Sequence, residues 1–352
     1  MTRPASNAAR DARRAAAKPA RATSPGQPAY APGEGREALV VAIDDGYAAY
    51  DQEEHLLATV GARFELRPCR RDPDATLAAV RDASVVLVRE SPLPRAAIEA
   101  MTNGRAVIRY GIGVDNIDQR AASKRRIAVC NVPDYGTDEV ATQAVALALA
   151  VVRRVRLHDA EVRAGRWSTG VLQPMYRLRG RTLGLIGYGR IARLTHAMFA
   201  GFGFARVLVA DPHPDLPPGV QAASVDDICR EADLISLHAP LKPQTRHLID
   251  ARRIATMRPT AILVNTARGG LVDLDALAAA LAQRRILGAG LDVFEHEPPD
   301  PAHPLFALDN VVVTNHIGWY SEESMRDLQR KAAEEAVRVL RGERPLHWLN
   351  PW

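Results

Sequence analysis

Residues Thr182 to Arg193 read "TLGLIGYGRIAR", and this stretch decides the fold. The apolar run at its start has the composition of a buried strand, and the pattern Gly187-x-Gly189-x-x-Ala192 follows directly. In such a pattern the first glycine allows a tight turn and the second lets backbone amides approach a pyrophosphate. The third small residue lets the helix pack on the strand. The stretch therefore predicts a strand, a phosphate-binding turn and a helix whose N-terminus faces an anionic ligand.

An acidic residue stands where this fold needs one. Nineteen residues after Ala192, the next strand-like run, "RVLVAD", ends at Asp211. A carboxylate there accepts hydrogen bonds from the adenosine ribose hydroxyls and repels a 2′-phosphate. The two features together predict NAD (NADH) as the cofactor, with NADP less favoured. The alternative is a glycine turn in an α/β domain that binds no ligand.

Short strand-like runs alternate with helical patterns on both sides of this stretch. Before it come "ALVVAI", "RFELR", "VVLV", "AVIRY" and "IAVCN"; from Thr182 onward come "TLGLIG", "RVLVAD", "LISLH", "AILVN", "GAGLD" and "VVVT". The alternation is typical of α/β folds with mainly parallel sheets. The second series has six strands, the number in a complete doubly wound dinucleotide fold.

Two long helical patterns flank the second series. "TDEVATQAVALALAVVRRV" begins at Thr137 and is apolar on most faces, so it belongs in a core or an interface. Thr137 or Asp138 is its candidate cap. The other, "SEESMRDLQRKAAEEAVRVLRGERP", has acids in its first turn and bases in its last, with Ser321 as candidate cap. It has no further domain to support, so we infer that it returns to the first domain.

A chain of 352 residues exceeds what one hydrophobic core serves, so two domains are expected. The predicted fold class is α/β with two Rossmann-like domains. One is discontinuous and flavodoxin-like, formed by residues 37–136 and 317–352; the other is doubly wound, formed by residues 137–316. Residues 1–36 are rich in Ala, Arg, Pro, Ser and Gly without apolar periodicity, which predicts a disordered basic tail.

The net charge of +5 comes from this tail. Residues 1–36 hold seven Lys/Arg and two acids, which leaves 39 of each in the rest of the chain. A solvated extension is the plain interpretation; a weak nucleic-acid-binding arm and an organelle-targeting segment are the alternatives.

No apolar run is long enough to span a membrane, so no membrane association is expected. Three scattered cysteines form no metal motif or disulfide framework, which favours a reducing cytoplasm.

Polar residues follow the carboxyl ends of the predicted strands in the second series. His238 closes "LISLH" and Arg268 follows "AILVN". Asp292 ends "GAGLD", Glu297 comes shortly after it, and His316 follows "VVVT". Open parallel sheets bind ligands at this edge, so we expect these side chains to meet beside the glycine turn.

This set of residue types suits hydride transfer to a 2-keto acid. The reaction needs a proton donor for the carbonyl oxygen and a cation for the carboxylate. A histidine beside a carboxylate supplies the first, and an arginine that can bind two oxygens at once supplies the second. Singly, Arg268, Glu297 and His316 could be a surface cap, a loop acid and a packed strand-end histidine. Together, beside a cofactor turn, they favour catalysis. The segment "EHEPPDPAHP" could be read as a metal site, but its prolines indicate an irregular loop, and no metal is predicted.

These motifs resemble the D-2-hydroxyacid dehydrogenases along nearly the whole chain after the tail. The matching stretches are "RYGIGVDNID", "NVPDYGTDEVA", "GLIGYGRIA", "NTARGGLVDLDAL", "GAGLDVFEHEP" and "TNHIGWYSEES". The resemblance implies that the discontinuous domain binds a small 2-keto or 2-hydroxy acid and the other domain binds NAD(H). It implies that Arg268, Glu297 and His316 are catalytic. It also implies a homodimer, for which the helix from Thr137 is the candidate interface, unless that helix is simply buried between the domains.

The resemblance further assigns residues to each ligand. Asp292 is expected to hold the nicotinamide carboxamide, and the glycine-rich loop from Tyr110 is expected to offer backbone amides to the substrate carboxylate. The full expected cofactor set is Ile186, Gly187, Tyr188, Gly189, Arg190, Ile191, Asp211, His238, Ala239, Thr245, Thr266, Ala267, Arg268, Asp292, His316 and Gly318. The expected substrate set is Arg89, Tyr110, Gly111, Ile112, Gly113, Arg268 and Trp319.

The end of the chain looks most like the branch that includes the C-terminal-binding-protein corepressors, in which a tryptophan matching Trp319 lines the substrate pocket. Phosphoglycerate dehydrogenases are the next most similar group. Asn315 departs from the proline that usually precedes the histidine, which could loosen the backbone there. The main hypothesis is an NAD-dependent, D-specific oxidoreductase of 2-hydroxy acids. The alternatives are an NAD(H)-sensing, corepressor-like binding protein, a phosphoglycerate dehydrogenase-like enzyme, and a nucleic-acid role of the tail. Trp319 and Tyr110 indicate aromatic pocket walls that admit an apolar or aromatic acid side chain.

Overall fold

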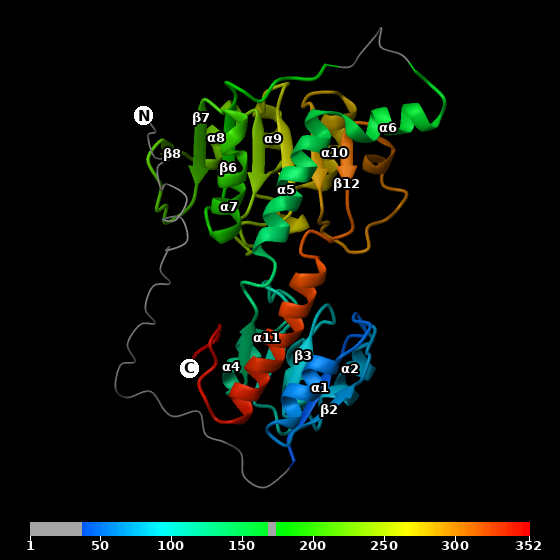
Figure 1. The fold of residues 1–352 in the computed structure, drawn as a ribbon, viewed down its shortest axis with the longest axis vertical. Helices are drawn as coiled ribbons and strands as arrows, with labels where there is room; N and C mark the ends of the chain where they lie inside the picture. Colours follow the sequence, from blue (N-terminus) through cyan, green and yellow to red (C-terminus); the bar gives the residue numbers. More distant parts are fainter. Residues whose placement is uncertain (1–36, 168–173) are drawn as a thin grey trace, which may run out of the picture.

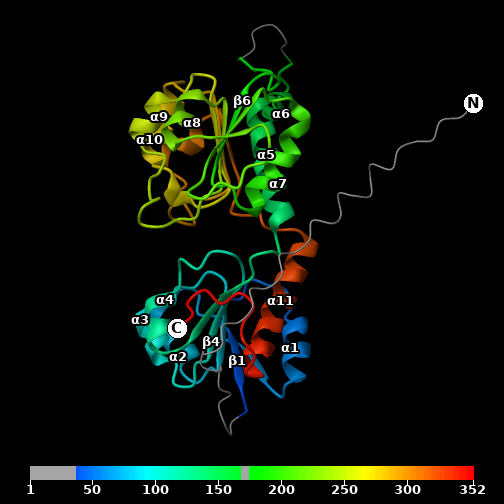
Figure 2. The same ribbon diagram turned by 90° about the vertical axis from the view of Figure 1, so that its left-hand side faces the viewer.

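The computed structural model describes residues 37–167 and 174–352. It contains two parallel sheets in two units, which lie one above the other along the long axis of the molecule (Figure 1). Helices cover both faces of each sheet (Figure 2). The predicted α/β class with two Rossmann-like units is confirmed. The expected disorder of residues 1–36 concerns a segment outside the described residues. Within the described ranges, no helix combines the length and the hydropathy needed to cross a membrane.

The smaller unit is built on a five-stranded sheet in the order β2-β1-β3-β4-β5, with every pair parallel. This is the flavodoxin-like order. Strands β1, β3 and β5 are buried along their whole length, which suits strands covered on both faces. In chain order the elements are β1 (Leu39–Ala42), α1 (Asp51–Ala58), β2 (Arg63–Leu66), α2 (Pro73–Val80), β3 (Val85–Val88), α3 (Arg95–Ala100), β4 (Ala106–Arg109), α4 (Gln119–Lys124) and β5 (Ala128–Asn131).

The last helix, α11 (Glu322–Leu340), returns to the smaller unit and packs beside α1 (Figure 2). Its N-terminus is a capping box, in which Ser321 Oγ accepts from the Ser324 amide at 2.9 Å and Ser324 Oγ accepts from the Ser321 amide at 2.8 Å. Ser321 Oγ also donates to Glu139 at 2.7 Å. The segment that enters the larger unit and the segment that leaves it therefore touch each other.

The larger unit is built on a seven-stranded parallel sheet in the order β12-β11-β10-β9-β6-β7-β8. The six strands predicted from the sequence are all present, and the glycine turn follows β6, which lies between β9 and β7 inside the sheet. The elements are α5 (Thr137–Val152), α6 (Val155–Arg163), β6 (Thr182–Ile186), α7 (Arg190–Phe199), β7 (Arg206–Ala210), β8 (Val220–Ala222), α8 (Val225–Glu231), β9 (Leu234–Leu237), α9 (Ala251–Thr256), β10 (Ile262–Asn265), α10 (Leu274–Ala282), β11 (Gly288–Leu291) and β12 (Val311–Val313).

The structure corrects three details of the prediction. A seventh strand, β8, lies at the edge of the sheet; it has three residues and a polar centre, so no sequence pattern marks it. The long helix from Thr137 is two helices, because Arg154 adopts a left-handed backbone conformation with φ of 49°. Neither Thr137 nor Asp138 caps the first of them: the N-cap is Gly136, without a side-chain hydrogen bond.

Helix α5 is apolar because it lies on the sheet of its own unit. Its buried residues are Ala141, Ala144, Leu147, Ala148, Val151 and Val152, and it contacts β10, β11 and β12. The close approach depends on Gly290 in β11, where a Cβ atom would lie 2.9 Å from Leu147 Cβ. Burial within one unit therefore accounts for the apolar faces on which the sequence expectation of an interface rested.

We predict that Gly290→Ala destabilises the protein by about 1–3 kcal/mol, because the added methyl group forces α5 away from the sheet. The matched control is Gly201→Ala, where a Cβ atom meets nothing within 4 Å. We expect that change to be neutral or stabilising by less than about 1 kcal/mol. Urea unfolding of both variants, followed by circular dichroism, measures the difference. Equal midpoints for the two variants would contradict this account of α5 packing.

Candidate active site

The glycine turn and Asp211 lie in direct contact. Gly187 has φ of +89°, and a Cβ atom there would lie 2.7 Å from the backbone of His238, so only glycine fits. Gly189 precedes α7, whose N-terminus has no side-chain cap. The Tyr188 amide donates to Asp211 Oδ2 at 2.8 Å. Helix α7 therefore presents free backbone amides beside a carboxylate, which fits the pyrophosphate and ribose of a dinucleotide.

The residues beside the two glycines range from buried to exposed, and one of them contacts the connection to the smaller unit. Ile186 is buried at the end of β6, and Ile191 is half-buried in the first turn of α7. Arg190 is exposed, and its Nη2 donates to the carbonyl of Pro133 at 3.1 Å. Because Pro133 lies in the segment that joins the two units, Arg190 ties the pyrophosphate-binding turn to that connection.

Three of the expected cofactor residues, His238, Ala239 and Thr245, follow β9. His238 Nε2 lies 2.9 Å from the hydroxyl of Ser236, and burial lowers the pKa of His238 to about 4, so the ring is neutral near pH 7. Thr245 Oγ1 accepts from the Lys242 amide at 2.7 Å, so this hydroxyl stabilises its own turn. Ala239 packs against the apolar core beside them.

His316 and Glu297 form a hydrogen-bonded pair. Nδ1 of His316 lies 2.7 Å from Glu297 Oε2, and the other carboxylate oxygen accepts from the Phe294 amide at 2.9 Å. Burial raises the pKa of Glu297, but the hydrogen bond to His316, the charges of His316 and Arg268 and the Phe294 amide together outweigh it, and the net pKa lies below its ordinary value. The carboxylate therefore stays ionised at neutral pH and loses its charge only as the pH falls through that lowered pKa. The imidazole uses Nδ1 for this pair, which leaves Nε2 for a substrate.

Arg268 reaches across from the larger unit to the smaller one. Its Nε donates to Asp115 at 2.9 Å, and its Nη1 donates to the Ala267 carbonyl at 2.7 Å. The Arg268 charge also contributes to the lowered pKa of Glu297, which puts the two side chains in the same site. Asn265 holds this segment in shape, because it donates to the Arg268 carbonyl and accepts from the Ala267 amide.

Asp292 is buried beneath the segment that carries His316. Its carboxylate accepts from Thr314 Oγ1, from the Ile317 amide at 3.0 Å and from the Gly318 amide at 2.9 Å. The Asp292 carbonyl also accepts from the His316 amide at 2.7 Å. His316 itself adopts a left-handed backbone conformation, with φ of 56°. Such a conformation persists only where the surroundings hold it, and Asp292 supplies those contacts.

The Asp292 contacts also bear on Asn315. Its side chain is exposed, while the backbone on its C-terminal side is fixed by bonds to Asp292. The absence of a proline at this position therefore does not leave the histidine loosely held. A carboxylate has about four lone-pair sites, so three accepted bonds leave room for one more donor, such as a carboxamide.

Thr266 offers a test of whether the site fits a dinucleotide. It is 7% exposed, and its Oγ1 has no hydrogen-bond partner within the described chain. A buried hydroxyl without a partner is rare unless a ligand or water completes it. Thr266 lies at the end of β10, on the same edge of the sheet as Gly187 and Asp292. This edge therefore combines a pyrophosphate-binding turn, a ribose-binding acid and free hydrogen-bonding capacity, which fits NAD.

The predicted substrate side shows one departure from expectation. Ile112 is held by its carbonyl, which accepts from Asn131 at 2.7 Å, and this fixes the loop from Gly111 to Gly113. Tyr110, however, is 3% exposed, and its hydroxyl donates to the buried Glu53 at 2.8 Å. Its ring therefore belongs to the core and does not form a wall of the pocket. Alternation along the β4 edge turns this side chain inward.

Other aromatic rings do lie on the predicted substrate side, and two of them stack against the guanidinium of Arg89. The Arg89 guanidinium lies 5.5 Å from the ring of Trp319 and 5.7 Å from that of Tyr47. Tyr135 packs against the other side of the same region, with its ring 6.1 Å from that of Trp319. The sequence identified Arg89 and Trp319, but Tyr47 and Tyr135 carry no motif that would have marked them.

The proline-rich segment sends its polar side chains to separate partners. Glu295 lies 2.9 Å from His247, and His303 lies 3.0 Å from Asp275. Glu297 is paired with His316. Across residues 37–167 and 174–352, no group of three or more His, Cys, Asp or Glu side chains is arranged to hold a metal ion.

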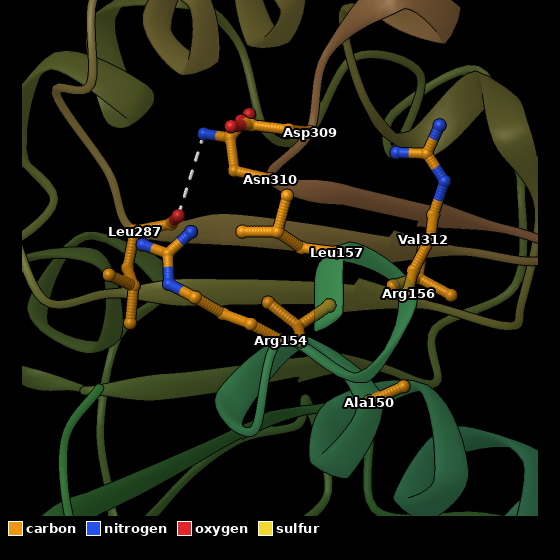
Figure 3. Close-up of a pocket in the computed structure, with 9 residues that line it drawn as sticks. Ala150, Arg154, Arg156, Leu157, Leu287, Asp309, Asn310 and Val312 are labelled. Carbon is orange, nitrogen blue, oxygen red and sulfur yellow. Dashed lines mark hydrogen bonds between the residues drawn. The ribbon is translucent and has the colours of Figure 1, made fainter. Parts of the chain in front are cut away.

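A small hollow lies away from this chemistry, at the opposite edge of the larger sheet. It is lined by residues of the α5–α6 junction, including Arg154, and by Leu287 and Asn310, which precede β11 and β12 (Figure 3). Asn310 donates to the Leu287 carbonyl across it at 3.5 Å. Its volume of about 10 Å³ admits at most one water molecule. The hollow is therefore not a substrate site.

Some functional contacts escaped the sequence reasoning. The pairing of Asp115 with Arg268 was not predicted, and neither was the role of Asn265, which fixes the backbone before Arg268. Arg71 donates to the carbonyl of Glu297 at 2.6 Å from a loop of the smaller unit. Asp115 and Asn265 both lie within stretches that match the family, whereas Arg71 lies outside any motif.

The comparisons with known proteins agree with this site. Residues 145–318 match the family described as "D-isomer specific 2-hydroxyacid dehydrogenase, NAD binding domain". A glyoxylate reductase of Korarchaeum cryptofilum is 40% identical over 277 residues, which cover 76% of this chain and 82% of that protein. A D-3-phosphoglycerate dehydrogenase of Methanocaldococcus jannaschii is 40% identical over 273 residues, 76% of this chain, and the match spans about half of that protein, 52%. A solved structure from Thermus thermophilus is similar with a TM-score of 0.81 and 34% identity, covering 88% of this chain and 99% of that one.

Fold and site together define an NAD-binding oxidoreductase of 2-hydroxy and 2-keto acids. The chain belongs to the D-isomer-specific 2-hydroxyacid dehydrogenase family. The resemblance inferred from the sequence motifs is confirmed at the level of the family.

We predict that Asp292→Asn lowers kcat by about 10- to 100-fold, because an amide cannot accept all the hydrogen bonds of the His316 segment and the imidazole shifts from its position. The matched control is Asp273→Asn, since Asp273 caps α10 and asparagine caps nearly as well. Steady-state kinetics with any accepted 2-keto acid measures the effect. An unchanged kcat in Asp292→Asn would show that the histidine is held by other contacts.

Proposed function

We propose that the protein reduces a 2-keto acid to the D-2-hydroxy acid with NADH, and catalyses the reverse oxidation with NAD. The His316–Glu297 pair, at 2.7 Å, is the observation that carries this proposal. Bound NADH supplies the hydride. In reduction His316 donates a proton from Nε2 to the carbonyl oxygen, and Glu297 stabilises the imidazolium. In oxidation the neutral imidazole accepts the proton.

Arg268 orients the substrate in this proposal. Its guanidinium can bind the substrate carboxylate and the carbonyl oxygen together, which polarises the carbonyl group for hydride transfer. Asp115 holds the same guanidinium at 2.9 Å, so the arginine is already directed toward the smaller unit. The loop from Gly111 to Gly113 supplies backbone amides to the carboxylate.

We assign the two units to the two ligands along the ranges expected from the sequence. Residues 137–316 bind NAD, and residues 37–136 and 317–352 bind the acid. The position of Asp211 at the glycine turn supports NAD over NADP, because a 2′-phosphate would meet this carboxylate. Trp319, packed on Arg89 and Tyr135, supports a place in the branch related to the C-terminal-binding-protein corepressors. The alternative in that branch is a protein that senses NADH. It would use the same cofactor site but would not need to turn over a substrate.

We predict that His316→Ala lowers kcat for 2-keto acid reduction by about 100- to 10,000-fold and leaves NADH affinity nearly unchanged, because the general acid is lost. His55→Ala, an exposed histidine on α1, is the control and should keep full activity. A panel of 2-keto acids with NADH and NADPH gives the rates, and NADH fluorescence gives the affinity. A wild-type protein that binds NADH yet reduces no acid would favour the sensor, and full turnover in His316→Ala would refute the assigned acid.

We further propose a homodimer in which α6 forms part of the contact. The helix has no buried residue, and Val155 and Val162 are each 54% exposed on its surface. Trp167, just after it, is 83% exposed. Helix α6 lies at the outer edge of the larger unit (Figure 1). Exposed apolar side chains gathered on one element favour association with another protein surface.

For this dimer, Val162→Glu should shift the protein toward monomer, because it places a charge in an apolar contact. Leu346→Glu is the control: Leu346 is 67% exposed in the smaller unit, away from α6. Sedimentation velocity at micromolar concentration distinguishes the species. A wild-type monomer at that concentration would rule out the dimer, and a dimeric Val162→Glu would exclude α6 from the interface.

We also propose the cytoplasm as the compartment. Cys69, Cys130 and Cys229 are all free and buried. Burial raises the pKa of the Cys229 thiol to about 11, which keeps it protonated and unreactive. Three free thiols suit a reducing environment.

A further inference from the structure

The loop that carries Glu297 is firmly held at its start, but its backbone has little support at the glutamate itself. The Phe294 backbone packs on Gly269, where a Cβ atom would lie 1.9 Å from the Phe294 carbonyl carbon. Both residues after Glu297 are prolines, which have no N–H to donate. Within residues 37–167 and 174–352, the backbone of residues 296–299 makes one hydrogen bond, and it is at the Glu297 carbonyl.

The donor to that carbonyl comes from the smaller unit. It is Arg71, in the loop between β2 and α2, whose Nη1 donates at 2.6 Å. Arg71 has φ of 63°, and Arg70 before it has φ of 48°. Residues with side chains adopt this left-handed conformation only where the surroundings hold it. The next residue, Asp72, caps α2 through the Ala75 amide. The turn that presents Arg71 is therefore a defined structure.

A carboxylate of the smaller unit holds the other arm of the Arg71 guanidinium. Nη2 of Arg71 lies 3.3 Å from Glu90 Oε2. The two side chains are 46% and 50% exposed, so the ion pair itself adds little to stability. It does fix the direction of Nη1. It also balances the charge of Arg71, which would otherwise compete with His316 for the Glu297 carboxylate.

Glu297 is thus held from two units at once. Its carboxylate accepts from the Phe294 amide at 2.9 Å and lies 2.7 Å from His316, and both of these residues belong to the larger unit. Its carbonyl is bound by Arg71 of the smaller unit. A displacement of about 1 Å in a catalytic group can reduce a rate about 100-fold. The contact at the carbonyl therefore bears on how well the carboxylate meets the imidazole.

We propose that Arg71 is a positioning residue for the acid–base pair. Directed by Glu90, it holds the backbone of Glu297 so that the carboxylate stays within hydrogen-bond distance of His316. The inference rests on the proposed function, because it concerns the same pair. Arg71 acts through Glu297 and takes no part in proton or hydride transfer. Both members of the pair lie in the larger unit, yet their alignment depends on a residue of the smaller one.

Kinetics of Arg71 variants give the first test. Arg71→Met should lower kcat for 2-keto acid reduction by about 5- to 50-fold, because the Glu297 backbone loses its anchor. The dissociation constant of NADH should change by less than about twofold, since the variant leaves the cofactor residues in place. Arg71→Lys should recover part of kcat, because it keeps a charged donor. The matched control is Arg70→Met: Arg70 has the same backbone conformation, is 80% exposed and pairs with Asp45.

Urea unfolding separates positioning from support of the fold. Arg71→Met and Arg70→Met should have the same midpoint as the wild type, because each removes an exposed ion pair. A fall in kcat for Arg71→Met alone, with unchanged midpoint and NADH affinity, supports the positioning role. Unchanged kcat in Arg71→Met, or an equal fall in Arg70→Met, overturns it.

The titration of His316 gives a readout that does not depend on turnover. Histidines labelled with ¹³C at Cε1 are followed by NMR in the NADH-bound protein, and the signal that His316→Ala lacks identifies His316. A carboxylate beside an imidazole favours its protonated form. Arg71→Met should therefore lower the proton affinity of His316 by at least about threefold, and Arg70→Met should leave it unchanged. Glu297→Gln gives the size of the full effect.

The outcomes distinguish this inference from the proposed function. A wild-type titration curve for His316 in Arg71→Met overturns the positioning role, whether or not any acid is reduced. A wild-type protein that reduces no 2-keto acid counts against the oxidoreductase alone. In that case the titration still decides whether Arg71 aligns the Glu297–His316 pair.

Discussion

The buried carboxylate of Asp292 is the interaction on which the site depends. It ends the strand beside β12 and accepts hydrogen bonds from Thr314, Ile317 and Gly318, the segment by which the chain leaves the larger sheet. That segment carries His316 in a left-handed conformation, which a residue with a side chain keeps only under constraint. The same segment leads into α11. One carboxylate therefore sets both the direction of the imidazole and the start of the connection to the smaller unit.

In the proposed mechanism, the chemistry requires both units. The larger one contributes the dinucleotide turn, the acid at the end of β7 and the His316–Glu297 pair, all at the carboxyl edge of one sheet. The smaller one contributes the loop after β4 and two guanidinia. Contacts already cross between them: Arg268 donates to Asp115, and Arg71 donates to the carbonyl of Glu297. Arg71 and Arg268 therefore connect the two units beside the His316–Glu297 pair.

The charge of the substrate region follows from this arrangement. Most of its cations are neutralised by carboxylates on neighbouring elements, and such pairs define geometry more than they attract a ligand. Arg109, at the end of β4, donates instead to the Tyr110 carbonyl at 2.6 Å. Stacking against Trp319 and Tyr47 keeps Arg89 extended toward the same space. Aromatic residues in such a pocket thus serve to orient charge, a function that composition alone does not reveal.

The sequence by itself determined the parallel α/β architecture, the glycine turn with Asp211, and the candidate set of Arg268, Glu297 and His316. These follow from apolar runs, turn residues and strand ends, which are local signals. Only the tertiary structure decided the rest. The edge strand β8 forms because β7 is there to pair with it, and the inward direction of Tyr110 depends on the buried Glu53. The counter-charges of Arg268 and His316 come from Asp115 and Glu297, which lie far from them in the chain. Such contacts have no local pattern, because the free energy of a buried charge is set by whatever the fold brings beside it.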